Sequence, residues 1–182
     1  MISPILPFYE RNKIDISYGK GPYVHLKDGS KCLDFAAGYA ANSFGHCHPR
    51  LVNVLKEQAE RLWHISNFFE IPGMFEYAAL LTRHTFADAV YFANTGAEAV
   101  ETSLKVARWF FNAKKAEDGG AAISPQWTQK HKIIVFDGAF HGRTLACTSA
   151  SDRAKMAGFG PPVEGFVRVP FNDLNAIEEV MS

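Results

Sequence analysis

Apolar residues recur at helical intervals in several stretches of the chain. Leu51, Leu55, Ala59 and Leu62 follow Pro49 on one helical face, which predicts an amphipathic helix that begins at the proline. A second helix is expected from Pro72 to about Phe86, a third from Ala97 onward and a last one over 173–182.

Short apolar runs alternate with these helices. Asp28-Gly29 is a strong turn signal inside Pro22–Phe35, which predicts a hairpin there. Strands are expected at 89–93, 132–136 and 166–169, and the polar stretch 117–129 is expected to be a surface loop. Strands that alternate with helices predict an α/β fold with mostly parallel pairing.

The composition narrows the class of protein. Hydrophobic residues make up 47% and charged residues 21% of the 182 residues, as in ordinary globular domains. The net charge of zero argues against nucleic acid or an anionic membrane as a partner. No leader or membrane span is recognised, and three scattered cysteines do not make a disulfide framework. The expected compartment is the cytoplasm.

The first candidate site lies where the predicted strand 89–93 meets the predicted helix. Asn94-Thr95-Gly96 forms the turn between them, and the helix follows from Ala97. The start of a helix offers free backbone N–H groups, Gly96 allows close approach and Thr95 adds a hydroxyl donor, which is the chemistry of a phosphate site. The alternative is a helix cap without a ligand, because Asn and Thr favour that position anyway.

The second candidate site follows the next predicted strand. Phe140 and Arg143 lie in the Gly-rich turn Asp137–Thr144. A displayed Phe140 can stack on a flat heteroaromatic ring, and Arg143 can hold a carboxylate through two parallel hydrogen bonds. Alternatively, Phe140 packs in the core and Arg143 caps a sheet edge.

Other chemistries fit the sequence less well. His46-Cys47-His48 contains good metal ligands, but they are too close in sequence to form a tetrahedral set alone, so no metal site is assigned. No G-x-S-x-G elbow, P-loop or G-x-G-x-x-G fingerprint occurs.

Taken together, these motifs resemble the class III pyridoxal-phosphate aminotransferases, over essentially the whole chain. The matching strings occur in the family's order. They are Tyr39-Ala-Ala-Asn-Ser-Phe-Gly-His-Cys-His-Pro49, His64-Ile-Ser-Asn-Phe-Phe69, Asn94-Thr-Gly-Ala-Glu-Ala-Val-Glu101, Lys105-Val-Ala-Arg108, Phe140-His-Gly-Arg-Thr144 and Val169-Pro-Phe-Asn-Asp173.

The resemblance implies the N-terminal portion of the fold-type I pyridoxal-phosphate transferase fold. That fold has a mixed, mostly parallel sheet flanked by helices, and here the sheet is expected to be incomplete. Residues 1–60 would form the N-terminal arm, hairpin and linking helix of the small domain. Residues 61–182 would form part of the large, cofactor-binding domain.

The resemblance also implies roles for five residues. Thr95, Gly96 and Ala97 match positions that bind the phosphate of pyridoxal 5′-phosphate, and Phe140 matches the aromatic residue that stacks on its ring. Arg143 matches the arginine that holds the substrate's α-carboxylate. Asn67 and His141 receive no role, and Phe69 stands where many relatives carry tyrosine.

The activity implied is transfer of the δ-amino group of N-acetylornithine to 2-oxoglutarate, which yields glutamate, within arginine biosynthesis and by a homodimer. Ornithine, succinylornithine, succinyldiaminopimelate and 4-aminobutyrate are alternative substrates. The family's Schiff-base lysine and the aspartate that pairs with the pyridinium nitrogen are expected beyond residue 182, so the chain alone is predicted to be inactive. A non-catalytic remnant or half of a split protein is the other reading.

Overall fold

A computed structural model describes residues 4–7, 10–117 and 131–181. The chain divides into two compact units, Met1–Met74 and Phe75–Ser182. The sequence-based division into 1–60 and 61–182 refers to the domains of the family's complete fold, and it stays a prediction.

The first unit contains a three-stranded antiparallel sheet in the order β1-β2-β3. The predicted hairpin is confirmed, and Asp28 holds its turn by accepting hydrogen bonds from the N–H and the hydroxyl of Ser30. Strand β1 was not expected. The strands are β1 Ile16–Lys20, β2 Tyr23–Leu26 and β3 Lys31–Leu33.

A loop then leads from β3 to helix α1, Pro49–Ala59. The helix begins at Pro49 as predicted, because proline has no N–H to lose in a first turn. The loop returns to the sheet at His46, whose backbone N–H and C=O pair with those of Gly21.

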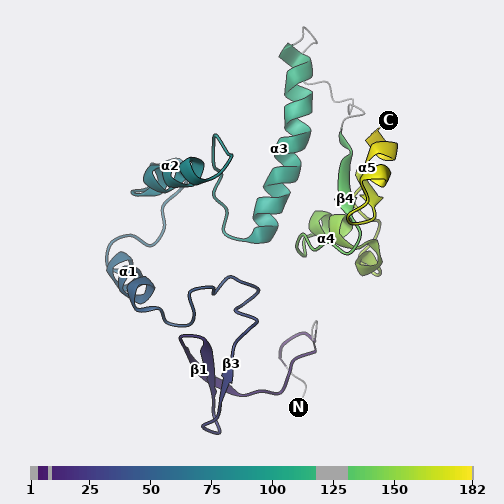
Figure 1. The fold of residues 1–182 in the computed structure, drawn as a ribbon. Helices are drawn as coiled ribbons and strands as arrows, with labels where there is room; N and C mark the ends of the chain where they lie inside the picture. The colour runs from purple at the N-terminus through teal and green to yellow at the C-terminus, as the bar shows by residue number, and fades with distance from the viewer. Residues whose placement is uncertain (1–3, 8–9, 118–130, 182) are drawn as a thin grey trace. The chain divides into compact units, whose positions relative to one another are not determined.

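The second unit contains a parallel pair of strands, β4 and β5, as the alternating pattern predicted. Ile133 pairs with Phe166 and Phe136 with Val169. Figure 1 shows the pair beside α5, with α4 near the end at which α3 begins. The elements are α2 Met74–His84, α3 Gly96–Glu117, β4 Ile133–Phe136, α4 Leu145–Ser151, a 3₁₀ turn Arg153–Met156, β5 Phe166–Val169 and α5 Leu174–Met181.

Small side chains dominate the core of the second unit. Cys147, Ser149, Ala150 and Ser151 of α4 are all buried, and Arg168 of β5 donates to the carbonyl oxygens of Ser149 and Ser151. These contacts end α4 and join it to the strand pair. The remaining buried residues are Val135, Met156 and Val169.

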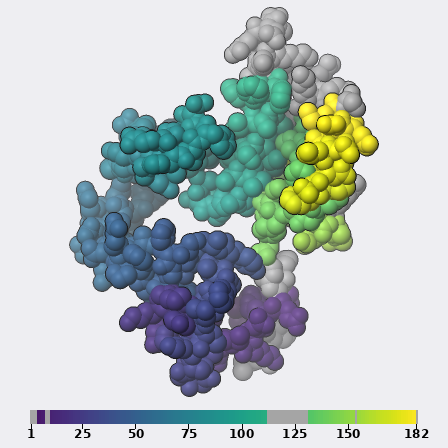
Figure 2. All heavy atoms as spheres, viewed as in Figure 1, coloured from purple at the N-terminus to yellow at the C-terminus, as the bar shows by residue number. Residues whose placement is uncertain are grey.

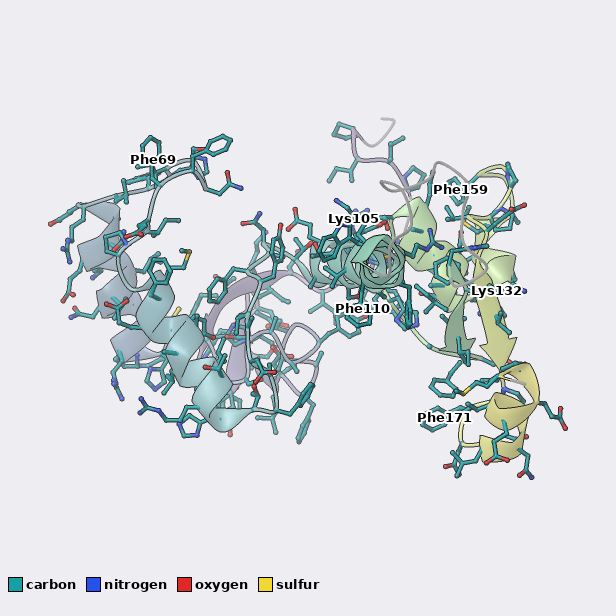
Figure 3. The ribbon with its side chains drawn as sticks, turned by 90° about the horizontal axis from the view of Figure 1, so that it is seen from above. Phe69, Lys105, Phe110, Lys132, Phe159 and Phe171 are labelled. Carbon is teal, nitrogen blue, oxygen red and sulfur yellow. The ribbon has the colours of Figure 1, made fainter. Side chains whose placement is uncertain are left out.

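The other helices of this unit stay at its surface. Seen end-on in Figure 3, α3 carries Lys105 and Phe110 on opposite sides, and Phe110 is exposed. Helix α5 lies at the surface in yellow in Figure 2 and contains no buried residue.

One expected strand is absent from the described residues. Residues 89–93 form neither a strand nor a helix, although their apolar run is typical of a buried strand. A strand exists only through hydrogen bonds to a neighbour, and pairing is not a local property of the sequence. Phe92 instead stacks on Tyr77, with ring centroids 5.6 Å apart. The predicted loop 117–129 lies almost wholly outside the described residues.

Candidate functional site

The start of α3 is held by a reciprocal capping box. The Thr95 hydroxyl accepts a hydrogen bond from the Glu98 N–H at 3.1 Å. The Glu98 carboxylate accepts from the N–H groups of Asn94 at 2.7 Å and Thr95 at 3.0 Å. This is the Thr-x-x-Glu pattern in which each residue satisfies the other's backbone.

The box leaves two backbone donors and one hydroxyl donor for a ligand. The N–H groups of Gly96 and Ala97 belong to the first turn of α3, where no intrahelical acceptor exists. The Thr95 hydroxyl accepts from Glu98 and still has its own proton to donate. A Cβ placed on Gly96 would meet no atom within 4 Å, so there is room for a ligand atom beside the backbone.

The second candidate site is the loop between β4 and α4. Phe140 is 66% exposed, so its ring is displayed rather than packed in the core. The guanidinium carbon of Arg143 lies 5.6 Å from the centre of that ring, which is cation–π geometry. The His141 N–H donates to the Ser151 hydroxyl at 2.8 Å and ties the loop to the buried end of α4.

The structure brings the two candidate sites together. A Cβ on Gly142 would lie 3.0 Å from the Ala97 Cβ, so the loop backbone rests on the first turn of α3. The Cys147 thiol lies 3.6 Å from the Ala97 carbonyl oxygen, and the Thr144 hydroxyl donates to the Glu101 carboxylate. The two clusters meet although the first does not follow a strand.

The electrostatics of this junction favour a bound anion at one point. The first turn of a helix carries a positive partial charge of roughly half a unit, and Arg143 adds a full positive charge on the neighbouring loop. The carboxylates of Glu98 and Glu101 act against this field: Glu98 caps the same turn, and both line an open groove of about 310 Å³ together with Lys105 and Thr144.

Sequence reasoning missed the residues that hold the two sites in place. Glu98 could have been found, because Thr-x-x-Glu before a helix is a readable capping signal. Glu101, Thr144 and Ser151 could not, because their partners lie far away along the chain. The Nε2 atom of His141 is buried and has no hydrogen-bond partner among the described residues.

Three other residues singled out in the sequence lie in the first unit. Asn67 is exposed, and Phe69, labelled in Figure 3, is 59% exposed. His46 contacts Asp34 rather than a metal-type cluster, with Nε2 2.9 Å from a carboxylate oxygen. Within the part of the chain that the structure describes, no His, Cys, Asp and Glu side chains gather as a metal site.

Comparison with known proteins places these motifs in context. Residues 8–181 match the family model described as aminotransferase class-III. Acetylornithine aminotransferase of Agrobacterium fabrum is 43% identical over 99% of this chain and 43% of its own length. The enzyme of that name from Shewanella oneidensis is 44% identical over 90% of this chain and 38% of its own. The chain thus spans about two fifths of these relatives.

Solved structures give the same picture. Ornithine aminotransferase from Toxoplasma gondii superposes with a TM-score of 0.83 and 32% identity over 97% of this chain and 40% of its own. Acetylornithine aminotransferase from Elizabethkingia anophelis superposes with a TM-score of 0.70 and 31% sequence identity, over 96% of this chain and 37% of its own. These likenesses confirm the predicted α/β fold class. In the residues that the structure describes, no helix has the length and apolar character needed to cross a bilayer.

Proposed function

Because this chain belongs to the class III aminotransferase family, we propose that it forms the phosphate and carboxylate side of a transaminase active site. The observation that carries the proposal is the contact of Gly142 with Ala97, which sets the Phe140–Arg143 loop against the Thr95–Ala97 turn. The Thr95–Ala97 turn offers hydrogen-bond donors for an anion. The adjacent loop offers the aromatic face of Phe140 and the positive charge of Arg143.

The donor set suits pyridoxal 5′-phosphate. The N–H groups of Gly96 and Ala97 and the hydroxyl of Thr95 would hold the phosphate at the positive end of α3. Phe140 would cover one face of the ring. When bound, this cofactor supplies an electron sink for carbanion chemistry at an amino acid. The protein's part at this junction is to bind, orient and exclude water.

Arg143 would hold the substrate's carboxylate. Its guanidinium carbon lies 5.6 Å from the centre of the Phe140 ring, so the charge stands close to the ring that would cover the cofactor. A planar fork fits a carboxylate through two parallel hydrogen bonds, which a lysine cannot reproduce.

The substrate we propose is N-acetylornithine, with 2-oxoglutarate as the amino-group acceptor and glutamate as the product, in arginine biosynthesis. Its support is the shared name of relatives that are 40–44% identical to this chain. Ornithine is the second candidate, favoured by the high structural likeness to ornithine aminotransferase.

Action as a homodimer and a cytoplasmic location stay predictions. Exposed aromatic residues such as Trp63 and Phe68 agree with an interface.

We also propose that the lysine that holds the cofactor covalently is not among these 182 residues. Lys105 lines the groove on the flank of α3, beside Glu98 and Glu101, rather than the Gly96–Ala97 turn. The purified chain should therefore give no turnover of N-acetylornithine and 2-oxoglutarate above the rate of free cofactor. Turnover that survives Lys105→Ala would show that another lysine of the chain acts.

Binding measurements on the full chain test the site itself. Titration with pyridoxal 5′-phosphate should give saturable binding that Gly96→Val abolishes, because the new side chain fills the space beside the donors. With cofactor bound, Arg143→Ala should weaken N-acetylornithine binding about ten- to a hundredfold, since a charge-assisted pair contributes about 1.5–3 kcal/mol. Arg143→Lys should recover little. Loss of cofactor in Arg143→Ala with retained substrate affinity would reverse the two assignments.

A further inference from the structure

Glu101 stands out at the junction because its charge opposes the proposed ligand. The helix dipole favours a carboxylate near the start of a helix, but the same charge repels a bound phosphate, so the contact that Glu101 makes indicates its role at this junction. Its partner in the structure is Thr144, whose hydroxyl donates to a Glu101 carboxylate oxygen.

Thr144 uses the same hydroxyl twice. While it donates to Glu101, it accepts a hydrogen bond from the Cys147 N–H at 3.1 Å and so caps helix α4. One oxygen atom thereby connects the flank of α3 to the beginning of α4. Because a hydroxyl has one proton and two lone pairs, both bonds form without competition.

These contacts fix the backbone directly after Phe140 and on both sides of Arg143. On one side, His141 is fixed by its N–H bond to Ser151 and Gly142 rests on Ala97. On the other side, the segment is fixed by Thr144. The exposed ring of Phe140 is packed against no core, so its position depends on the backbone anchors that follow it at His141, Gly142 and Thr144.

We propose that Glu101 and Thr144 are positioning residues: their hydrogen bond sets the Phe140–Arg143 segment in register with the Thr95–Ala97 turn, so that ring and phosphate of one ligand are held together. This inference rests on the proposed function. Aromatic stacking holds only over a narrow range of ring separations and offsets, so loss of the bond weakens the ring contact while the phosphate donors stay intact.

The proposal predicts different effects on two probes. Inorganic phosphate tests the α3 turn alone, and pyridoxine 5′-phosphate tests the turn plus the ring, without an aldehyde that could react with lysines. The dissociation constant of phosphate divided by that of pyridoxine 5′-phosphate measures the contribution of the ring. A lower ratio means a weaker ring contact. Glu101→Ala should lower that ratio about two- to tenfold, the range for loss of one hydrogen bond. The same change should leave phosphate affinity unchanged or higher, because a negative charge is removed.

Two substitutions of Thr144 separate positioning from helix capping. Asn and Asp both cap helices well, but only Asn has an N–H that can donate to Glu101. Thr144→Asp should lower the ratio, and Thr144→Asn and Thr144→Ser should retain it. Thr148→Val serves as the matched control on α4. The Thr148 hydroxyl makes no hydrogen bond with a residue that the structure describes, so this variant should behave like the unchanged chain.

Each outcome decides a different statement. An unchanged ratio in Glu101→Ala, or equal weakening of both probes in Glu101→Ala and Thr144→Asp, would overturn the positioning roles and leave the cofactor site standing. Equal affinity of the unchanged chain for the two probes would overturn the proposed cofactor site itself. A lowered ratio in Glu101→Ala and Thr144→Asp, with the ratio retained in Thr144→Asn, would support the inference.

Discussion

The loops of the two units are held by different kinds of contact. In the first unit, the Asp34 carboxylate organises the loop after β3: it accepts from the N–H groups of Ala36 at 3.1 Å and Ala37 at 3.0 Å and contacts His46. In the second unit, the loop after β4 is tied to buried small residues of α4 and to the first turn of α3.

The difference follows from where the apolar core lies. Every buried residue among those described falls between Val135 and Val169, in the second unit. The loop of the first unit therefore depends on an ionised side chain, and it contains left-handed backbone at Ala37, Tyr39 and Ala40. Such conformations cost roughly 1–2 kcal/mol each for residues with a Cβ. The Asp34 carboxylate therefore stabilises a strained loop in the first unit, whereas side-chain packing and helix caps stabilise the proposed site in the second.

The largest expected effect tests the first unit. Gly45 has φ +80°, and a Cβ there would lie 2.8 Å from the Gly21 carbonyl oxygen. Gly45→Ala should destabilise the sheet by about 3 kcal/mol, from backbone strain plus overpacking. Segment-resolved hydrogen exchange should show faster exchange in β1 and β2. Gly29→Ala, with positive φ but open space, should cost about a third of that. Equal losses of stability in Gly45→Ala and Gly29→Ala would show that the close contact with Gly21 adds nothing to the backbone strain.

Gly142→Ala should have a slightly smaller effect, confined to the second unit. Its φ is +129°, and the new methyl group would stand 3.0 Å from the Ala97 Cβ and 3.2 Å from that of Cys147. We expect a loss of about 2–3 kcal/mol, measured as faster hydrogen exchange in α4. The control is Gly138→Ala, whose Cβ would meet no atom within 4 Å. If exchange instead rises in β1 and β2, the two units do not respond independently.

Removal of the capping box should have an effect of about 1 kcal/mol on α3. Glu98→Ala leaves the N–H groups of Asn94 and Thr95 without their acceptor. Glu98→Gln should retain most of the stability, because glutamine also closes a capping box. Hydrogen exchange of the first turns of α3 provides the measurement. A similar loss in both variants would mean that the charge of Glu98, rather than its hydrogen bonds, stabilises the turn.

The smallest effect is a difference in acid sensitivity. Hydrogen bonds from the Ala37 backbone and from His46 hold the pKa of Asp34 below its ordinary value. A lowered folded-state pKa stabilises the loop above the ordinary value of about 3.9, and this stability is lost as pH falls through the folded-state pKa. The Ala37 amide should therefore lose protection below about pH 4. The His141 amide, bonded to a hydroxyl that does not titrate there, should not.

Asp34→Asn is the matched control for this pH dependence. An amide oxygen still accepts from Ala36 and Ala37, but it does not titrate. The variant should show weaker Ala37 protection at neutral pH and no acid-dependent loss of it. Acid loss that persists in Asp34→Asn would assign the effect to another group of the first unit.

Local signals in the sequence determined most of the elements and both candidate sites. Pro49 set the start of α1, Asp28-Gly29 set the hairpin turn, and Thr95 with Glu98 set the start of α3, because turns and caps are satisfied within a few residues. The family resemblance identified the residues of the proposed site for the same reason: its motifs are contiguous strings.

Only the tertiary structure decided which of these strings meet. Glu101 and Thr144 are 43 residues apart, and no local pattern connects a carboxylate on α3 with the cap of α4. The strand expected at 89–93 failed for the complementary reason, because an apolar run becomes a strand only beside a partner. Propensity and capping act between near neighbours in sequence, whereas register between loops and pairing between strands depend on contacts that exist only after the chain has folded.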